Sequence, residues 1–261
     1  MRARRGLMVA VAASAVAVLS GCADASGDPG SAGSSVAPTA ELTVFAAASL
    51  QGAFDDLSQA FESVHPEVEV RPIVYDGSTA LVAQLAEGAS ADVFATADED
   101  TMAKAVDEGL VTDPDVFATN TLVVAVPDGN PGGVEELADL ADERLTVVLC
   151  AAEVPCGAAS QRLLESAGVT VAPASFEQNV TAVLTKVAAG EADAGLVYAT
   201  DVESEPDVES FVPEGAADVV NRYPIAALDR ATNPAAAAAF VAFVRAPEGQ
   251  AVLAEHGFGV P

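Results

Sequence analysis

Basic, aromatic and histidine side chains are scarce in this chain. Its 261 residues hold 11 Lys and Arg against 39 Asp and Glu, with two His, no Trp and 5% aromatic residues. The net charge of −28 excludes a nucleic-acid partner, because proteins bind phosphate backbones through basic patches. The motifs G-x-S-x-G, H-E-x-x-H and G-K-[ST] are also missing, and the two histidines are scattered. We therefore expect a protein that is not an enzyme.

The apolar run at the N-terminus, Leu7 to Leu19, has 13 residues and is too short to span a bilayer, which takes about 20. Three arginines precede it, so residues 1–21 are predicted to be a secretory signal. The run ends in Leu19-Ser20-Gly21-Cys22, which resembles the bacterial lipobox, whose cysteine is acylated after cleavage. We expect an exported protein anchored to the extracytoplasmic side of the cell membrane by lipid on Cys22. The alternative is an ordinary signal peptide with an incidental cysteine.

Cysteine is rare, and beyond Cys22 the chain has Cys150 and Cys156. An exported protein occupies an oxidising compartment, where a cysteine pair usually forms a disulfide. A redox-active or metal-binding pair is the alternative, although the spacing is not C-x-x-C and no histidine is a sequence neighbour. We expect a Cys150–Cys156 disulfide and no metal cation held directly by side chains.

Large apolar side chains are almost missing from residues 22–39, which consist mainly of Ser, Gly, Ala, Pro and Asp. This composition predicts a flexible tether, because it cannot bury enough surface to order itself. From residue 40 the chain holds about 220 residues, enough for one large domain or two lobes. Hydrophobic residues make up 51% of the sequence, which allows a sizeable core.

Segments with strand and helix character alternate from residue 42 onward. The apolar patterns predict strands at 42–46, 68–74, 92–96, 121–126, 145–149, 193–198 and 225–228. They predict helices at 50–61, 78–86, 99–107, 134–140, 157–167, 179–189 and 234–244. This alternation predicts an α/β fold of two lobes, each with a mixed, mostly parallel sheet flanked by helices.

Small hydroxyl side chains or bare backbone amides recur where a predicted strand gives way to a helix. The stretches are Ala46 to Leu50, Asp76 to Thr79, Val154 to Gly157 and Glu177 to Thr181, while Gly195 to Tyr198 ends a strand with a phenol. A helix N-terminus leaves amide hydrogens unbonded and carries roughly half a positive charge. In open α/β sheets ligands bind off the carboxyl ends of the strands. The five stretches therefore predict an anion site made of neutral groups.

Three segments carry a resemblance to a known family: Phe45 to Leu50, Ala91 to Asp98 and Gly195 to Asp201. Together with the C-terminal stretches Ala246 to Gln250 and His256 to Gly259, they resemble the periplasmic molybdate-binding proteins of ABC transporters, which are type II solute-binding proteins. The resemblance covers nearly all of residues 41–261. It implies a two-lobed periplasmic-binding-protein fold, no cofactor, molybdate or tungstate as the ligand, and a monomer that delivers it to a membrane permease.

The resemblance also implies which residues hold the oxyanion. Ser49 and Ser78 would each give a hydroxyl and an amide, Cys156 and Val180 an amide each, and Tyr198 its phenol proton. Cys156 replaces a small residue of the family, but an amide donor does not depend on the side chain, and a disulfide to Cys150 would fix its loop. Taken singly, the serines could be helix caps, Val180 a core residue and Tyr198 a core aromatic with a polar tip.

Lobe 1 is expected to combine residues 40–121 with 222–261, and lobe 2 to consist of residues 122–221. Two crossing strands, near 121–126 and near 221–228, are expected to form the hinge between them. Closure on a ligand requires contacts that exist only in the closed form, and donors from both lobes would supply them.

Three acidic residues, Asp76, Glu153 and Glu177, lie close to the proposed donors. We expect all three to point to solvent, because a buried carboxylate would repel a dianion. Two other functions stay open for the chain. It could bind another tetrahedral oxyanion, sulfate or phosphate, or it could be a surface lipoprotein with no role in transport.

Overall fold

The computed structural model describes residues 39–203 and 205–261. They belong to one unit of the chain, which begins at Val36. The predicted signal segment, Cys22 and the tether up to residue 38 lie outside the described residues, so the lipid anchor stays a prediction. No helix within the described ranges combines the length and apolar character that a membrane span requires.

The first of two five-stranded sheets has the strand order β4-β2-β5-β12-β6. Its strands are β2 (Val44–Ala47), β4 (Val74–Asp76), β5 (Val93–Ala95), β6 (Asp115–Asn120) and β12 (Asn221–Ala227). The pairs β4-β2 and β2-β5 are parallel, whereas β12 runs antiparallel to both β5 and β6. This sheet and the elements packed on it are called lobe 1 here.

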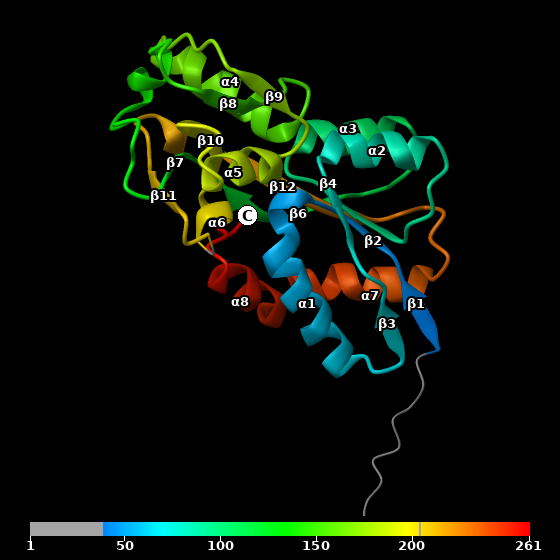
Figure 1. Cartoon of the computed structure of the whole chain (residues 1–261). Coiled ribbons are helices and arrows are strands. Elements are labelled where there is room, and N and C mark those ends of the chain that lie inside the picture. The colour runs from blue at the N-terminus through cyan, green and yellow to red at the C-terminus, as the bar shows by residue number, and fades with distance from the viewer. Residues whose placement is uncertain (1–38, 204) are drawn as a thin grey trace, which may run out of the picture. The chain divides into compact units, whose positions relative to one another are not determined.

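Apolar side chains at helical spacing fix the helices of lobe 1. These helices are α1 (Gln51–Val64), α2 (Ser78–Ala86), α3 (Glu99–Asp107), α7 (Pro234–Arg245) and α8 (Pro247–Glu255). Phe54 and Phe61 of α1 pack on Phe240 of α7, with ring centroids 6.1 and 5.2 Å apart. Figure 1 shows α1 and α7 beside the small parallel sheet of β1 (Ala40–Leu42) and β3 (Val68–Val70).

The second five-stranded sheet, with the order β11-β7-β10-β8-β9, forms lobe 2. Its strands are β7 (Leu122–Pro127), β8 (Val147–Cys150), β9 (Ser175–Glu177), β10 (Ala194–Tyr198) and β11 (Val208–Phe211). The pairs β10-β8 and β8-β9 are parallel, and β7 is antiparallel to β10 and β11. The helices are α4 (Pro155–Ala167), α5 (Val180–Ala188) and α6 (Ala199–Val202). Each sheet is therefore mixed and mostly parallel, as predicted, because four strands run in one direction and one strand, β12 or β7, runs against them.

The chain passes between the two sheets at Thr121, which separates β6 from β7, and again between β11 and β12. The Thr121 amide donates to the side chain of Asn120 (2.9 Å). Beside this crossing the C-terminal tail pairs with β6, because the backbones of Thr119 and Gly259 exchange two hydrogen bonds of 2.9 Å. The hinge itself and the predicted lobe boundaries stay predictions.

Three strands, β6, β9 and β11, lie wholly outside the predicted strands. All three lie at sheet edges, and the side chains of β9 and β11 are half-buried or exposed, so no apolar alternation marks those two strands. The single strand predicted at 68–74 is two strands, β3 and β4, separated by a segment that contains Pro72. Proline lacks the amide hydrogen that a ladder needs. The helix predicted at 134–140 is only a 3₁₀ helix at Leu137–Ala141.

Cys150 and Cys156 form the predicted disulfide, which joins the end of β8 to the first turn of α4. The loop between them is tightly folded. A Cβ atom on Gly157 would lie 1.8 Å from the carbonyl oxygen of Ala151. The disulfide and the glycine together hold the start of α4 against the end of β8.

Replacing both Cys150 and Cys156 by alanine is expected to lower the free energy of unfolding by about 2 kcal/mol, since closure of a short loop no longer restricts the unfolded chain. Denaturant unfolding under oxidising conditions measures the change. The unmodified protein under reducing conditions is the control and is expected to lose a similar amount. Equal stability of the oxidised wild type and the double variant would contradict the prediction.

Candidate functional site

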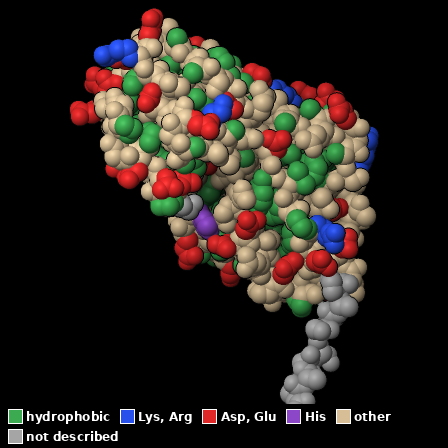
Figure 2. All heavy atoms as spheres, viewed as in Figure 1, with side chains coloured by type: hydrophobic (Ala, Val, Ile, Leu, Met, Phe, Trp, Pro, Cys, Tyr) green, Lys and Arg blue, Asp and Glu red, His purple; other side chains and the backbone are tan. Residues whose placement is uncertain are grey.

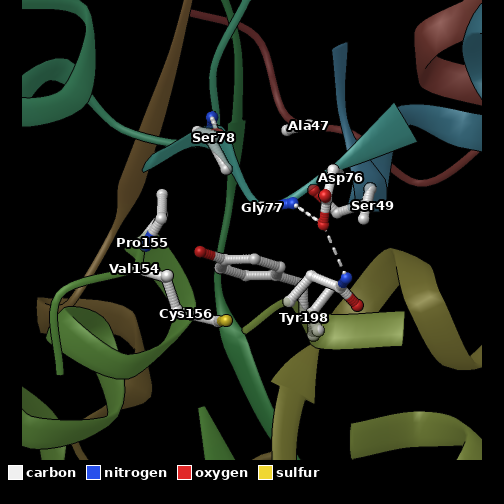
Figure 3. Close-up of a pocket in the computed structure, with 13 residues that line it drawn as sticks. Ala47, Ser49, Asp76, Gly77, Ser78, Val154, Pro155, Cys156 and Tyr198 are labelled. Atoms are coloured by element: carbon white, nitrogen blue, oxygen red, sulfur yellow. Dashed lines mark hydrogen bonds between the residues drawn. The ribbon is translucent and has the colours of Figure 1, made fainter. Parts of the chain in front are cut away.

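The five residues predicted to hold an oxyanion all lie where a strand ends. Ser49 is in the 3₁₀ helix Ala48–Leu50 after β2, Ser78 begins α2 after β4, and Cys156 is the second residue of α4 after β8. Val180 begins α5 after β9, and Tyr198 is the last residue of β10. All five line one hollow, with Ser49 and Ser78 from lobe 1 and the other three from lobe 2. Figure 3 shows four of them around this space.

The hollow is small. Its cavity volume is about 10 Å³, close to the smallest volume that holds one water molecule, whereas pockets for drug-sized ligands take about 300–1,000 Å³. The remaining lining residues are Ala47, Ala48, Asp76, Gly77, Ala97, Val154, Pro155 and Asn179. A drug-sized ligand is therefore too large for this hollow.

The phenol of Tyr198 is oriented as a donor. Tyr198 is 1% exposed, and the side-chain amide of Asn221 donates to its hydroxyl oxygen (2.9 Å) and to the carbonyl oxygen of Ala97 (2.8 Å). Because the phenol oxygen already accepts from Asn221, its own proton is left for a group in the hollow. Burial raises the pKa of Tyr198 well above its usual value, so the phenol stays protonated.

The serine hydroxyls are arranged in a similar way. The Ser78 oxygen accepts from the Ala97 amide (3.1 Å), which leaves its proton free. The hydroxyls of Ser49 and Tyr223 lie 3.0 Å apart and share a hydrogen bond. Neither serine is a helix cap, because the N-cap positions are Ala47 and Gly77, and no side chain there makes a capping bond. The alternative that both serines serve as caps is therefore wrong.

Backbone amides of three helix starts complete the lining. Ser78, Cys156 and Val180 lie in the first turns of α2, α4 and α5, where an amide has no carbonyl four residues earlier in the helix. No side chain of the described residues caps α2 or α4. In α5 the Asn179 side chain takes the Ala182 amide (2.9 Å) and leaves that of Val180. The three helix ends place partial positive charge on one point.

Tyr198 is also held through its backbone. Its amide donates to the carboxyl group of Asp201 in the first turn of α6 (2.8 Å). Burial raises the pKa of Asp201 to about 7, although the bond from the Tyr198 amide acts in the opposite direction. The bond fixes the point at which β10 ends and the phenol enters the hollow.

Charged groups are almost excluded from the lining, which among the described residues contains no Lys or Arg. The prediction that Asp76 points to solvent is wrong, because Asp76 is half-buried and lines the hollow. Glu153 is exposed, as predicted. Glu177 does not enter the hollow. Its carboxylate is half-buried against Lys186 (2.5 Å), which lowers its pKa.

The two lobes touch beside the hollow. A Cβ atom on Gly77 of lobe 1 would lie 2.1 Å from the carbonyl oxygen of Gln178 in lobe 2. Nearby, the Thr79 hydroxyl donates to the carbonyl oxygen of Glu153 (2.8 Å). Sequence reasoning missed this contact at Gly77, because a glycine at an N-cap has several ordinary explanations.

This chain is similar in sequence to known proteins over most of its length. The sequence pattern of the family described as bacterial extracellular solute-binding protein matches residues 42–259. The molybdate-binding protein ModA of Mycobacterium tuberculosis is 45% identical over 223 residues, which cover 84% of this chain and 85% of that protein. The chain belongs to the ModA family. This membership confirms a solute-binding protein rather than an enzyme, and one that works outside the cytoplasm.

Solved structures agree in fold. The periplasmic molybdate-binding protein of Azotobacter vinelandii superposes with a TM-score of 0.73 at 21% identity, covering 84% of this chain and 99% of that one. The sulfate-binding protein SubI of Mycobacterium tuberculosis gives 0.70 at 18% identity, covering 84% and 86%. At these identities the likeness shows the fold alone. It confirms the predicted two-lobed periplasmic-binding-protein architecture.

Substituting Gly77→Ala is expected to hinder the close approach of the lobes without disturbing lobe 1. The backbone at Gly77 has φ −58° and ψ 131°, which alanine adopts without strain, while the added Cβ atom would overlap Gln178. We expect anion affinity to fall by about tenfold or more, because the closed form becomes less populated. Calorimetry with molybdate as the test anion measures the change.

The control for this variant is Gly52→Ala, in the exposed first turn of α1. Both variants should unfold close to the wild-type temperature. Wild-type affinity in Gly77→Ala would show that the contact with Gln178 plays no part in binding.

Proposed function

We propose that this ModA-family protein captures molybdate between its lobes and delivers it to the permease of an ABC transporter. The observation that carries the proposal is the convergence of five predicted donor positions on one small hollow. The identity to a molybdate-binding protein over most of both chains supports the same ligand.

A hollow lined by neutral donors suits a fully deprotonated dianion. Each oxygen of such an ion accepts hydrogen bonds, so every N–H and O–H of the lining finds a partner. Helix N-termini add partial positive charge at contact range. The surface charge opposes this only weakly, because screening in physiological salt acts over about 8 Å. Figure 2 shows acidic side chains spread over the visible face, with few basic ones among them.

The proposed roles follow the geometry of each donor. Ser78 would give its hydroxyl and its amide, since its hydroxyl oxygen already accepts from Ala97. Tyr198 would give the phenol proton that the bond from Asn221 leaves free. Ser49 would give a hydroxyl and an amide, and Cys156 and Val180 an amide each. Donors from both lobes would then favour the closed form when the anion is bound.

Selectivity is expected to depend on the size and protonation of the anion. Tungstate is nearly the same size as molybdate and should bind similarly. The smaller sulfate ion should leave some donors without a hydrogen-bond partner. Hydrogen phosphate carries a proton that faces donors, which costs the hydrogen bonds it displaces. Asp76 lines the hollow and could accept such a proton, so phosphate is a more informative competitor to test than sulfate.

The protein is further proposed to be a monomer attached to the outer face of the membrane by lipid on Cys22. The lipobox-like Leu19-Ser20-Gly21-Cys22 and the tether composition of residues 22–39 support this attachment. A tether of this kind would let the two lobes move relative to the membrane while staying near the permease.

Removing a single proposed donor should weaken molybdate binding by about 1–2 kcal/mol, the range for a buried hydrogen bond whose partner is lost. The variants are Tyr198→Phe and Ser78→Ala, measured by titration calorimetry. Matched controls are Tyr75→Phe and Ser58→Ala, whose hydroxyls bond to Asp55 on the surface of lobe 1. Wild-type affinity in both donor variants would refute the proposed ligand set.

The anion itself is tested by calorimetry with molybdate, tungstate, sulfate and phosphate on the full exported domain. We expect molybdate and tungstate to bind with similar affinity and both to exceed sulfate and phosphate by about tenfold or more, because unfilled donors are costly. Equal sulfate and molybdate affinities would assign the chain to another oxyanion. No response to any of the four would favour a surface lipoprotein without a transport role.

A further inference from the structure

Besides the bond from Thr79 to Glu153, a hydrogen bond between two side chains crosses from lobe 1 to lobe 2 at the edge of the hollow. The carboxylate oxygen Oδ1 of Asp76, at the end of β4, accepts from the side-chain Nδ2 of Asn179 (2.9 Å). The same oxygen accepts from the backbone amide of Gly77 (2.7 Å). Figure 3 shows both bonds, with the carboxylate of Asp76 beside the lining residues. The bond from Gly77 therefore holds the Asp76 carboxylate in place within lobe 1, while the bond from Asn179 joins it to lobe 2.

Asn179 uses both ends of its side-chain amide. Its Oδ1 accepts from the Ala182 amide (2.9 Å) and so caps α5, while its Nδ2 reaches Asp76. The residue after it is Val180, one of the proposed amide donors. The bond to Asp76 therefore ties the start of α5, with the Val180 amide, to the opposite lobe.

The position of Asp76 calls for an explanation, because a carboxylate beside a dianion raises the energy of the bound state. Asp76 has no ion-pair partner among the described residues. Its hydrogen bonds are those to Gly77 and Asn179. A charged acceptor makes a stronger bond than a neutral one, so the negative charge strengthens the link across the lobes.

We propose that Asp76 and Asn179 form a latch that closes the lobes beside the anion site. The bond joins the lobes without passing through the ligand, so it favours closure by itself. It also positions the Val180 amide, while neither side chain needs to touch the anion. The proposal rests on the proposed function of the hollow, and it makes Asp76 and Asn179 positioning residues for that function.

A latch of this kind raises anion affinity by increasing the population of the closed form. If only the closed form binds the anion, the apparent affinity equals the affinity of the closed form multiplied by the fraction of molecules that are closed. The Asp76–Asn179 bond raises that fraction, and the missing Cβ atom of Gly77 lets the lobes come close enough to form it. The Coulomb cost of the carboxylate is then offset by closure.

Asn179→Ser separates the latch from the helix cap. Serine caps a helix about as well as asparagine, but its side chain is too short to reach Asp76 while it caps α5. We expect Asn179→Ser to weaken molybdate binding about ten- to a hundredfold, the range for one charge-assisted hydrogen bond. Titration calorimetry on the full exported domain measures the change.

A double-mutant cycle with Asp76→Ala decides whether the bond is responsible. Asp76→Ala alone removes both the latch and the repulsive charge, so its single effect has no fixed sign. In the Asp76→Ala background, Asn179→Ser should have no further effect on affinity. An equal loss in both backgrounds would overturn the proposal, because Asn179 would then act without Asp76.

Asn233→Ser is the matched control, since its Nδ2 bonds to the Glu41 carbonyl oxygen within lobe 1 (2.7 Å), far from the hollow. It should keep wild-type affinity. Tyr198→Phe separates the proposed anion site from the proposed latch. If Tyr198→Phe weakens binding while Asn179→Ser does not, the site is supported and the latch is refuted. If the wild type binds no molybdate, the proposed function itself falls.

Small-angle X-ray scattering of the protein without anion measures its radius of gyration. This radius would not change if Asn179 acted only on its immediate surroundings. We expect the ligand-free Asn179→Ser variant to have a larger radius of gyration than the ligand-free wild type. Both should contract to the same value with saturating molybdate. Equal radii in the ligand-free proteins would overturn the latch.

Discussion

The rest of the structure depends on the convergence of helix starts from two sheets on one small hollow. A strongly acidic chain with 11 basic residues has few cations to offer an anion, so the attraction must come from aligned peptide groups and oriented hydroxyls. Each proposed donor is fixed by a neighbour: the Ser78 hydroxyl by the Ala97 amide, and the Tyr198 phenol by Asn221. These bonds use up the acceptor side of each oxygen and leave the proton facing inward.

The sheets place these groups where the chemistry needs them. Parallel strands bring their carboxyl ends to one edge, and the helices that follow begin there. Each sheet has four strands in one direction and one opposed, and in each case three neighbouring parallel strands carry the site. The disulfide between Cys150 and Cys156 adds a covalent restraint at the start of α4.

Much of this arrangement could be predicted from the sequence. The helices α2 and α3 have the predicted bounds, because their apolar residues recur at helical spacing, and the five proposed donors were identified from strand-to-helix junctions and family motifs. The edge strands β9 and β11 escaped prediction because half-exposed strands of three or four residues carry no pattern. Asp76 was placed wrongly, since its inward position depends on Asn179, 103 residues away. Asn221 escaped notice for the same reason: its partners, Ala97 and Tyr198, come from different lobes.

The Cys150–Cys156 bond has a consequence for where the protein matures. Thiols stay reduced in the cytosol and pair only after export, so a newly made chain lacks the covalent restraint on the Cys156 amide until it has crossed the membrane. The surface of lobe 2 that lines the hollow therefore reaches its final rigidity only after export.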